Sequence, residues 1–504
     1  MKKIEISSLP TSIDFWQILT LGCGVIYVTI SIVFVLYGQL NADEGWYLYS
    51  SKLVYEGQLP YKDFAFTQTP LLPFVYGFFQ KLGSSALYIG RITSVLLSTG
   101  AFYLSIRSAI KVSGKLAGFL TALFWATFTY GIYFQSITKT YSLLILLFSA
   151  TFYVLLFDKN KERGLILASL FVLLAILTRL SALFFALPIL GYAFYTGTRK
   201  TKLTIFVLCV SLCLLFSLLF LPNWSATTWN LLLHHTNQWG DLSRTEKISA
   251  ILRVRLPLLF LAYPTYSALM LVLVGINFRT VYPVFKKNKI VMLIFISSLL
   301  FAIPHLISGG YHAEYFVTML FMMFSVLSIL SIETFRKQKM VSRIFVQTLI
   351  LSTFLLGFAR GGWMYIDLSG GSLPIEEVQN LAALVDRNSN ENDSIFALEG
   401  LSISLESNRE TLPGMTMAQF SYYEGDKVEA TKYNLINDEM IADSIRNKTP
   451  SLIILTSLDW ELMKNSAKLE EIERLIFENY SLLIFQDNFG QHQDLVEIYS
   501  RNED

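Results

Sequence analysis

Two adjacent carboxylates, Asp43 and Glu44, follow an apolar run that extends from Phe15 to Tyr37. A carboxylate just beyond the end of a membrane span costs little when water reaches it, so a solvated surface charge is the simplest interpretation. That interpretation leaves the neighbours unexplained, since Trp46 and three tyrosines come soon after the acidic pair. A carboxylate among aromatic residues at a membrane surface could act as a general base that takes a proton from an attacking hydroxyl. Asp43 is our candidate for that base.

The loop that contains this pair extends from residue 38 to residue 83. Its part at about 44–56 predicts a helix at the membrane interface with an aromatic stripe. After Gly57, the turn "QLPYKDF" returns Tyr61, Lys62 and Asp63 to the interface, and "PLLPFVYGFFQKL" (70–82) is too short to span and is expected to lie there too. Such a loop is suited to bind an amphiphile with a polar head. We therefore expect the turn residues to contact substrate, while Glu44 could either orient Asp43 or contact the acceptor.

Composition places the chain in a membrane. The chain has 504 residues, of which 53% are hydrophobic and only 15% charged, with a mean hydropathy of +0.48, whereas soluble domains have about 25% charged residues. Residues 1–360 carry 30 Lys/Arg and 12 Asp/Glu, while residues 361–504 carry 10 and 26. We expect a basic membrane domain (1–360) followed by an acidic soluble domain (361–504). All three cysteines lie in apolar runs, so neither a thiolate metal site nor a disulfide is expected.

Apolar runs long enough to span a bilayer predict a polytopic α-helical membrane protein with about eleven transmembrane helices. The pair within 164–197 is short and could be a kinked or re-entrant hairpin. The runs are 15–37, 84–106, 116–134, 141–157, 164–178, 182–197, 203–221, 254–276, 290–307, 314–332 and 343–359.

Orientation follows from the basic loops. The tracts "MKK", "RSAIKVSGK", "DKNKER", "TRKTK", "RTVYPVFKKNK" and "RKQKMVSR" all fall on one side, which is then the cytoplasm. The N-terminus is expected inside, in the plasma membrane. The 38–83 loop, the 222–252 loop, "SGGYH" (308–312) and the C-terminal domain are expected outside.

The segment after residue 361 changes character. "PIEEVQNLAALVDR" predicts an amphipathic helix, and "SIFALEG", "PSLIILT" and "YSLLIFQD" predict short buried strands, with helices in "DEMIADSIR" and "AKLEEIERLIFENY". We expect a small extracytoplasmic α/β domain. It has no Gly-rich phosphate loop and no metal-ligand spacing, so we expect a lid or an acceptor-docking scaffold.

The order "DEGWYLYSSKLVYEGQLPYKDF … PLLPFVYGFFQKLG … GRITSVLLS" resembles the first loop and second span of GT-C membrane glycosyltransferases. The nearest subset is the protein O-mannosyltransferase and lipid A aminoarabinose transferase group. "SGGYHAEYFVTMLFMM" (308–323) also resembles a late loop of that family. The likeness covers most of residues 15–360 in layout, whereas specific motifs cover only 43–95 and 308–320.

The resemblance implies a sugar transferred from a polyprenyl- or dolichyl-phosphate carrier to an acceptor lipid, glycan or protein at the outer face, with Asp43 as the base. No nucleotide sugar is available outside the cytoplasm, which agrees with a lipid-linked donor. An inverting single displacement needs one base rather than two carboxylates astride the sugar. No further cofactor, divalent metal or nucleic-acid partner is expected. Membrane lipids are expected to surround the chain.

A lipid phosphate as leaving group requires cations near the outer ends of the spans. Lys62, Arg91, Lys139 and Arg179 are the candidates. Charge within a span is expensive and commonly functional, which favours Arg91 and Arg179. A structural ion pair or a snorkelling side chain is the alternative for each. Relatives with a lysine before the proline pair of the first loop differ from this chain, which has "QT" before Pro70, and Lys62 could replace that lysine.

Histidines supply the remaining candidates. His234 and His235 are adjacent and point to different helix faces, so they predict no chelating pair. They could line the sugar or acceptor site or belong to an interfacial belt. His312 and Glu314, with His305, could close the cavity from the far side.

Other functions fit the sequence less well than transfer does. A polymerase or ligase of lipid-linked glycans would also use outer loops, but usually a large late one. A transporter would need paired, broken helices at mid-membrane, and a purely structural membrane scaffold would need none of these charges.

Overall fold

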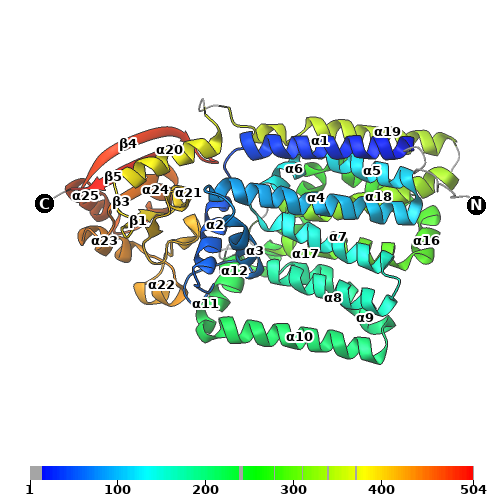
Figure 1. Cartoon of the computed structure of the whole chain (residues 1–504), viewed down its shortest axis with the longest axis horizontal. Helices are drawn as coiled ribbons and strands as arrows, with labels where there is room; N and C mark the ends of the chain where they lie inside the picture. The colour runs from blue at the N-terminus through cyan, green and yellow to red at the C-terminus, as the bar shows by residue number, and fades with distance from the viewer. Residues whose placement is uncertain are drawn as a thin grey trace, which may run out of the picture.

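The computed structural model describes residues 14–237, 242–276, 278–308, 310, 312–337, 340–368 and 372–502. The tract "MKK" and parts of "RKQKMVSR" and "SGGYH" lie outside the described residues. Figure 1 shows a bundle of long helices that run side by side and a smaller α/β part beyond the end of the bundle where α1 finishes. The elements of the first loop lie at that same end.

Long apolar helices build the bundle. The backbone inside a bilayer must satisfy its own hydrogen bonds, and a continuous apolar run does so by forming a helix. The long helices and the shorter segments that continue or connect them are α1 (Phe15–Tyr37), α4 (Ala86–Ser113), α5 (Lys115–Thr127), α6 (Thr129–Ser136), α7 (Thr140–Phe157), α8 (Lys161–Thr178), α9 (Ala182–Thr196), α10 (Arg199–Phe220), α13 (Arg244–Ala250), η3 (Ile251–Arg255), α14 (Leu256–Ala262), α15 (Pro264–Met270), η4 (Leu271–Ile276), α16 (Phe278–Lys287), α17 (Lys289–Ile307), η5 (Ala313–Phe316), α18 (Val317–Lys337) and α19 (Met340–Ala359).

Every expected apolar run is helical, but not every run makes a full span. Among the described residues seven helices are long and apolar enough to cross a membrane, or nine if each of two bent pairs counts as one span. The helices α8 and α9, which pack against each other, account for the difference from eleven. The 15 residues of α9 rise only about 22 Å, short of the ~30 Å hydrocarbon core. The protein is a multi-pass membrane protein by these helices.

The two bent pairs break at single residues. The α5–α6 pair bends by 73° at Phe128, and the segment from α13 to α14 bends by 97° relative to α15 at Tyr263. Pro264 follows Tyr263, and a residue before proline is disfavoured in the helical region. Tyr263 accordingly has φ −129° and ψ 55°.

Short helices cover the end of the bundle near the α/β part. They are α2 (Ala42–Tyr55), α3 (Leu71–Gln80), η1 (Leu221–Asn223), α11 (Trp224–Thr228), η2 (Trp229–Leu233) and α12 (His234–Asn237). The helix α3 lies so close to α2 that a Cβ on Gly77 would stand 2.5 Å from the carbonyl oxygen of Ser51. The expected interfacial helices at 44–56 and 70–82 are therefore present and packed together.

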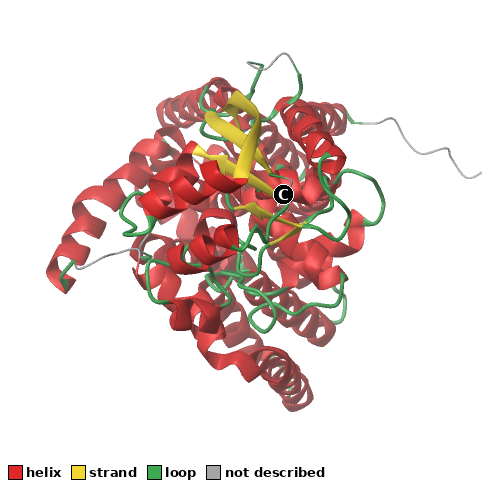
Figure 2. Cartoon of the chain, turned by 90° about the vertical axis from the view of Figure 1, so that its left-hand side faces the viewer, coloured by secondary structure: helices red, strands yellow, loops and turns green. Residues whose placement is uncertain are grey.

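A five-stranded sheet of order β2-β1-β3-β5-β4 forms the C-terminal part (Figure 2). Strand β1 pairs in parallel with β2 and β3, while β5 is antiparallel to β3 and β4. The strands are β1 (Ser394–Ala397), β2 (Glu410–Thr411), β3 (Leu452–Thr456), β4 (Tyr480–Phe489) and β5 (Asp494–Arg501). The helical elements are η6 (Trp363–Tyr365), α20 (Pro374–Arg387), α21 (Leu401–Glu406), η7 (Ala418–Ser421), α22 (Lys427–Tyr433), α23 (Asp438–Arg446), α24 (Ser457–Met463) and α25 (Leu469–Asn479).

One buried cluster joins this sheet to the first loop. It contains Trp46 and Leu48 of α2 together with Ile454 of β3 and Ile498 of β5. Burying apolar surface between α2 and the sheet contributes roughly 25 cal/mol per Å². The α/β part is therefore packed onto the loop that carries Asp43.

Candidate functional site

The helix α2 begins at Ala42 because Asn41 caps it. The side-chain oxygen of Asn41 accepts a hydrogen bond from the backbone N–H of Asp43 (3.2 Å), and Glu44 Oε1 accepts one from the backbone N–H of Asn41 (3.2 Å). This reciprocal capping box satisfies two N–H groups that a helix start leaves free. It also fixes two neighbouring carboxylates in different surroundings, since the side chain of Asp43 is 26% exposed and that of Glu44 is 0% exposed.

Asp43 is held by two donors. Its Oδ1 accepts a hydrogen bond from Trp46 Nε1 (3.0 Å), and its Oδ2 lies 2.8 Å from Lys139 Nζ. Burial acts to raise the pKa of Asp43, but the charge and hydrogen bond of Lys139, with the Trp46 bond and nearby His312, lower that pKa on balance. Asp43 is therefore an ionised carboxylate with one partly exposed edge.

Lys139 bridges two carboxylates from distant parts of the chain. Besides Asp43, its Nζ lies 2.6 Å from Glu314 Oε1, which also accepts a hydrogen bond from the Tyr141 hydroxyl (3.2 Å). Burial alone would lower the pKa of Lys139, but the negative charges of Asp43 and Glu314 raise it well above its usual value. We call Asp43, Lys139 and Glu314 the charge bridge. It brings together three residues that the sequence singled out separately.

Glu44 pairs with Arg91 instead of facing solvent. Arg91 Nε donates to Glu44 Oε2 (2.9 Å) and Nη2 donates to Oε1 (2.6 Å), with both side chains fully buried. The remaining donors of Arg91 reach backbone carbonyl oxygens at the end of α1, those of Phe34, Val35, Gly38 and Gln39. Because these contacts occupy the guanidinium, the geometry favours the structural role for Arg91 over phosphate contact.

Arg179 lines a cavity of about 450 Å³ beside the charge bridge. Its Nη1 donates to the Thr140 hydroxyl (3.3 Å), and its guanidinium stacks 4.8 Å from the ring centre of Tyr315. No carboxylate of the described residues lies within ion-pair distance of Arg179. The other lining residues are Thr67, Gln68, Thr69, Leu180, Ser181, Leu183, Phe184, Leu231, Leu232, His235, Thr236, Pro304, His305, Ile307 and Ser308.

Two histidines share this Arg179 cavity. His235 Nε2 donates to the backbone carbonyl of Thr67 (3.0 Å), which requires a proton on that nitrogen. Burial lowers the pKa of His235, so the ring is neutral at pH 7. His305 is 4% exposed, and its Nε2 has no hydrogen-bond partner among the described residues. The cavity therefore offers the cation of Arg179 and two imidazoles, of which that of His235 is neutral, beside an apolar lining.

The other histidine candidates lie outside the Arg179 cavity. His234 packs edge-on against Phe420 of the α/β part, with ring centres 5.5 Å apart, and burial lowers its pKa to about 4. His312 packs against Tyr315, with ring centres 5.2 Å apart, and lies close enough to Asp43 to lower the pKa of that acid.

The turn residues of the first loop are not brought to the charge bridge by any described contact. Tyr61 is fully buried, adopts φ 66°, and donates its hydroxyl to the carbonyl of Gln68. Lys62 lies 3.7 Å from Asp63, whose Oδ2 accepts from the backbone N–H of Leu59 (2.8 Å). The turn instead meets the α/β part, where the Asn434 side chain donates to the Tyr61 carbonyl (2.9 Å). These contacts favour a structural role for the turn.

Sequence reasoning missed one acid of the α/β part. Glu399 follows strand β1 and lines a cavity of about 30 Å³ against Asn41, Ala42 and Gly45. Burial raises the pKa of Glu399 well above its usual value, and the negative charges of Asp459 and Asp43 raise it further. The only sequence signal was its position at the end of a predicted buried strand, and the structure shows that this strand pairs in parallel, an arrangement in which polar residues at the strand end commonly meet ligands.

Tyr141 and Tyr315 were also missed, because each stands at the start of an apolar run where an aromatic residue is ordinary. No group of three or more His, Cys, Asp or Glu side chains in the described ranges is arranged to hold a metal ion.

Residues 67–241 match the family described as dolichyl-phosphate-mannose-protein mannosyltransferase. No curated protein sequence matches the chain. The matched segment contains Arg179 and His235 and begins after the acidic pair of the first loop.

Solved structures extend the similarity to nearly the whole chain. ArnT from Cupriavidus metallidurans bound to undecaprenyl phosphate is 11% identical with a TM-score of 0.59, over 96% of this chain and 98% of that chain. The oligosaccharyltransferase of Archaeoglobus fulgidus is 11% identical with a TM-score of 0.50, over 96% of this chain and 74% of that one. Both are GT-C glycosyltransferases. The expected resemblance to GT-C membrane glycosyltransferases is thereby confirmed, and the fold is theirs.

Proposed function

We propose that this chain is a glycosyltransferase that moves a sugar from a polyprenyl-phosphate donor to a hydroxyl acceptor at the outer face of the plasma membrane. The observation that carries the proposal is the charge bridge beside the Arg179 cavity: an ionised, partly exposed carboxylate next to a cation-bearing pocket lined by apolar residues. The family match and the ArnT-like fold support the same class of reaction.

Asp43 acts as the general base. Its carboxylate is ionised at neutral pH because Lys139 lowers its pKa, and its exposed edge leaves room for an acceptor hydroxyl. Lys139 and Trp46 hold both carboxylate oxygens of Asp43 in place. Less side-chain motion is therefore lost when the acceptor hydroxyl forms its hydrogen bond to Asp43. Glu44 is excluded from this role by its burial against Arg91.

Arg179 receives the phosphate of the donor. A guanidinium presents paired N–H groups that match phosphate oxygens, and this one has no acidic partner among the described residues. The imidazole of His305, whose Nε2 has no hydrogen-bond partner among the described residues, adds a polar group, and the leucines and Phe184 of the cavity can contact the polyprenyl chain. ArnT, which shares this fold, was crystallised with undecaprenyl phosphate.

The reaction is a single displacement. The acceptor oxygen forms a bond to the anomeric carbon, the bond from that carbon to the phosphate oxygen breaks, and the hydroxyl proton passes to Asp43. The polyprenyl phosphate leaves with its negative charge beside Arg179, and the anomeric configuration is inverted. On this proposal Arg179 supplies the positive charge, so no divalent metal is required.

Asp43→Asn tests the base. The amide keeps the shape of the side chain but cannot accept the proton, so transfer should fall about 10²- to 10⁴-fold. Transfer is measured in a strain that lacks the protein and is complemented with each variant, by mass spectrometry of its polyprenyl-phosphate sugars and surface glycans. The donor should accumulate with Asp43→Asn as it does in the uncomplemented strain.

Glu56→Gln is the matched control, because Glu56 lies at the end of the same helix and its nearest cation, Lys52, is 4.0 Å away. It should leave transfer unchanged. Normal transfer by Asp43→Asn, in protein that reaches the membrane at wild-type levels, would remove Asp43 as the base.

A further inference from the structure

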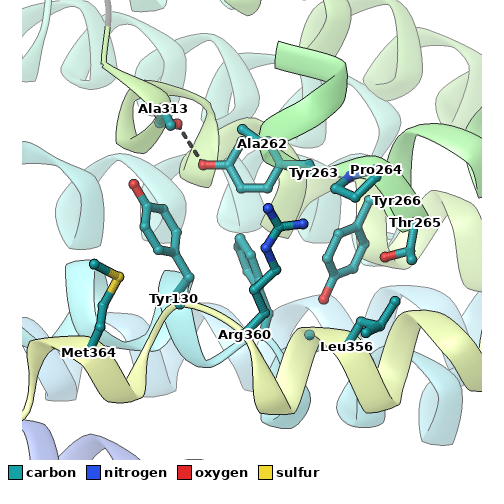
Figure 3. A pocket seen from close by; sticks show the side chains of 13 residues that line it. Tyr130, Ala262, Tyr263, Pro264, Thr265, Tyr266, Ala313, Leu356, Arg360 and Met364 are labelled. Atoms are coloured by element: carbon teal, nitrogen blue, oxygen red, sulfur yellow. Dashed lines mark hydrogen bonds between the residues drawn. The ribbon is translucent and has the colours of Figure 1, made fainter. Parts of the chain in front are cut away.

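A second cavity, of about 230 Å³, lies where the two bent helix pairs meet the end of α19. Figure 3 shows its side chains, which come from the breaks at Phe128 and Tyr263 and from the last turn of α19. We call it the bend pocket. Its lining residues are Phe128, Tyr130, Ala262, Tyr263, Pro264, Thr265, Tyr266, Ala313, Leu356, Gly357, Arg360, Gly361 and Met364.

One buried hydroxyl in the bend pocket has no partner. Tyr266 is 4% exposed, and its Oη forms no hydrogen bond with any described residue. The hydroxyl faces Gly357, where a Cβ would stand 2.5 Å from it. A buried, unsatisfied hydroxyl is destabilising unless something binds it. A ligand with a hydrogen-bonding head would remove that destabilisation.

A cation lines the same pocket. Arg360 extends from the end of α19 toward the α14–α15 bend, and in Figure 3 its guanidinium lies between Tyr263 and Tyr266. No carboxylate of the described residues forms an ion pair with Arg360. A phosphate or carboxylate group in the pocket would form an ion pair with the guanidinium of Arg360 and accept a hydrogen bond from the Tyr266 hydroxyl.

The surroundings of the pocket are apolar and open. Leu356 of α19 and Met364 of η6, both in its lining, are 49% and 74% exposed, and α19 also presents Leu351, Leu355 and Phe358 outward. Since α19 is a candidate membrane span, these side chains face lipid. A ligand of the bend pocket therefore combines an acidic head with an apolar chain.

The bend pocket and the Arg179 cavity lie on two sides of one short segment. Ala313 lines the bend pocket, and its carbonyl accepts a hydrogen bond from Tyr263 (2.6 Å), while Tyr315 lines the Arg179 cavity. Glu314 stands between them and joins the charge bridge through Lys139. Two amphiphiles could thus approach Asp43 from opposite sides of residues 313–315.

We propose that the bend pocket binds the acceptor, and that this acceptor is a lipid with an acidic group in its head and a free hydroxyl. This inference rests on the proposed function, in which the Arg179 cavity is taken by the donor. A soluble protein or glycan acceptor would have no use for an apolar cavity open to the bilayer. The lipid hydroxyl is the group whose proton passes to Asp43.

Arg360→Gln and Tyr266→Phe test the pocket, with Arg253→Gln as control. Arg253 is an exposed cation of the same bent segment outside the pocket lining. Lipid binding to the purified full chain is measured as a thermal shift with phosphatidylglycerol, with uncharged phosphatidylcholine, and with undecaprenyl phosphate. The lipid, glycan and protein fractions of complemented strains are compared by mass spectrometry.

The phosphatidylglycerol shift should exceed the phosphatidylcholine shift and should disappear in Arg360→Gln, while undecaprenyl phosphate still stabilises that variant. A glycosylated acidic lipid should be present with the wild type and with Arg253→Gln, and reduced at least tenfold with Arg360→Gln. Tyr266→Phe should weaken the shift without loss of folded protein.

Three results would overturn the inference. If the glycosylated product that Arg360→Gln loses belongs to the protein or glycan fraction, the acceptor is a protein or a glycan and not a lipid. A shift that Arg360→Gln abolishes without any change in lipid product would make the site one for a structural membrane lipid. Equal thermal shifts with phosphatidylglycerol in the wild type and all variants would mean that the bend pocket does not bind an acidic lipid. Failure of the proposed function is separate, because it would show as normal transfer by Asp43→Asn whatever Arg360 binds.

Discussion

Asp43 and Glu44 are neighbours in sequence, yet the fold gives them opposite tasks. Successive residues of a helix point about 100° apart, so one can face a cavity while the next faces the bundle. Glu44 is fully buried against Arg91, and Asp43 keeps an exposed edge beside Lys139. On the proposed function, the acidic pair is therefore one structural and one reactive carboxylate.

Lys139→Met should change the pH dependence of transfer. Lys139 lowers the pKa of Asp43, so its removal should raise that pKa, and the uncompensated charge of Glu314 would raise it further. The base works only when ionised, and the ionised fraction falls as pH drops through the pKa. The acidic limb of the kcat/KM profile should therefore move to higher pH in Lys139→Met, as measured from pH 4 to pH 8.

Lys52→Met is the control for this profile, because Lys52 lies on α2 but pairs with Glu56 rather than with Asp43. Its acidic limb should coincide with that of the wild type. An unshifted limb in Lys139→Met would mean that the titrating base is not in contact with Lys139.

At the scale of elements, a single buried ion pair ties three helices together. Arg91 on α4 binds Glu44 on α2 and the carbonyl groups at the end of α1, and Glu44 also accepts the backbone N–H of Thr138 before α7 (3.2 Å). Removing one partner of such a pair leaves a buried charge and typically costs about 3–5 kcal/mol.

Glu44→Gln should accordingly destabilise the protein far more than Asp43→Asn does. The amide leaves the Arg91 charge uncompensated in a fully buried site. We expect a clearly lower unfolding temperature for Glu44→Gln in detergent, followed by intrinsic fluorescence, and a near wild-type value for Asp43→Asn. Similar unfolding temperatures for the two variants would show that the pair does not anchor α2.

Sequence patterns predicted the elements better than their breaks. Apolar runs identified the helices of the bundle, and three of the strands, β1, β3 and β4, were expected from short apolar stretches. Strand β5 was not, because "DLVEIYSR" mixes polar and apolar residues on a strand that pairs on both sides. The 73° bend at Phe128 was missed too, since no proline or glycine occupies that position.

The candidate site shows the same limit. Asp43 was identifiable because its acidic and aromatic neighbours are close in sequence. The contact of Lys139 with Glu314 was not, because 175 positions separate them and only the packing of the bundle brings them together. Arg91 was expected at a phosphate, since a sequence cannot say that a charge in a span already has its partner.

At the scale of the whole molecule, the charge bridge, both cavities' cations and the α/β part gather toward one end of the bundle. Figure 1 shows α2 and α3 between the long helices and the sheet, and the shared buried cluster makes them continuous. If that end faces outward, the site meets lipid-linked donors. If it faces inward, it meets nucleotide sugars, and a lipid-linked donor is no longer required.

A reporter fused after residue 504 decides between these orientations. The basic loops are expected in the cytoplasm, which places the C-terminal end outside. An alkaline phosphatase fused after residue 504 should therefore be active, and a fluorescent protein that matures only inside the cell should be dark at the same position. The same pair of reporters inserted in the 158–160 loop, within the basic tract "DKNKER", should give the reverse pattern. Because α2 and the sheet share one core, a cytoplasmic C-terminal reporter would also place Asp43 inside and would contradict a polyprenyl-phosphate donor.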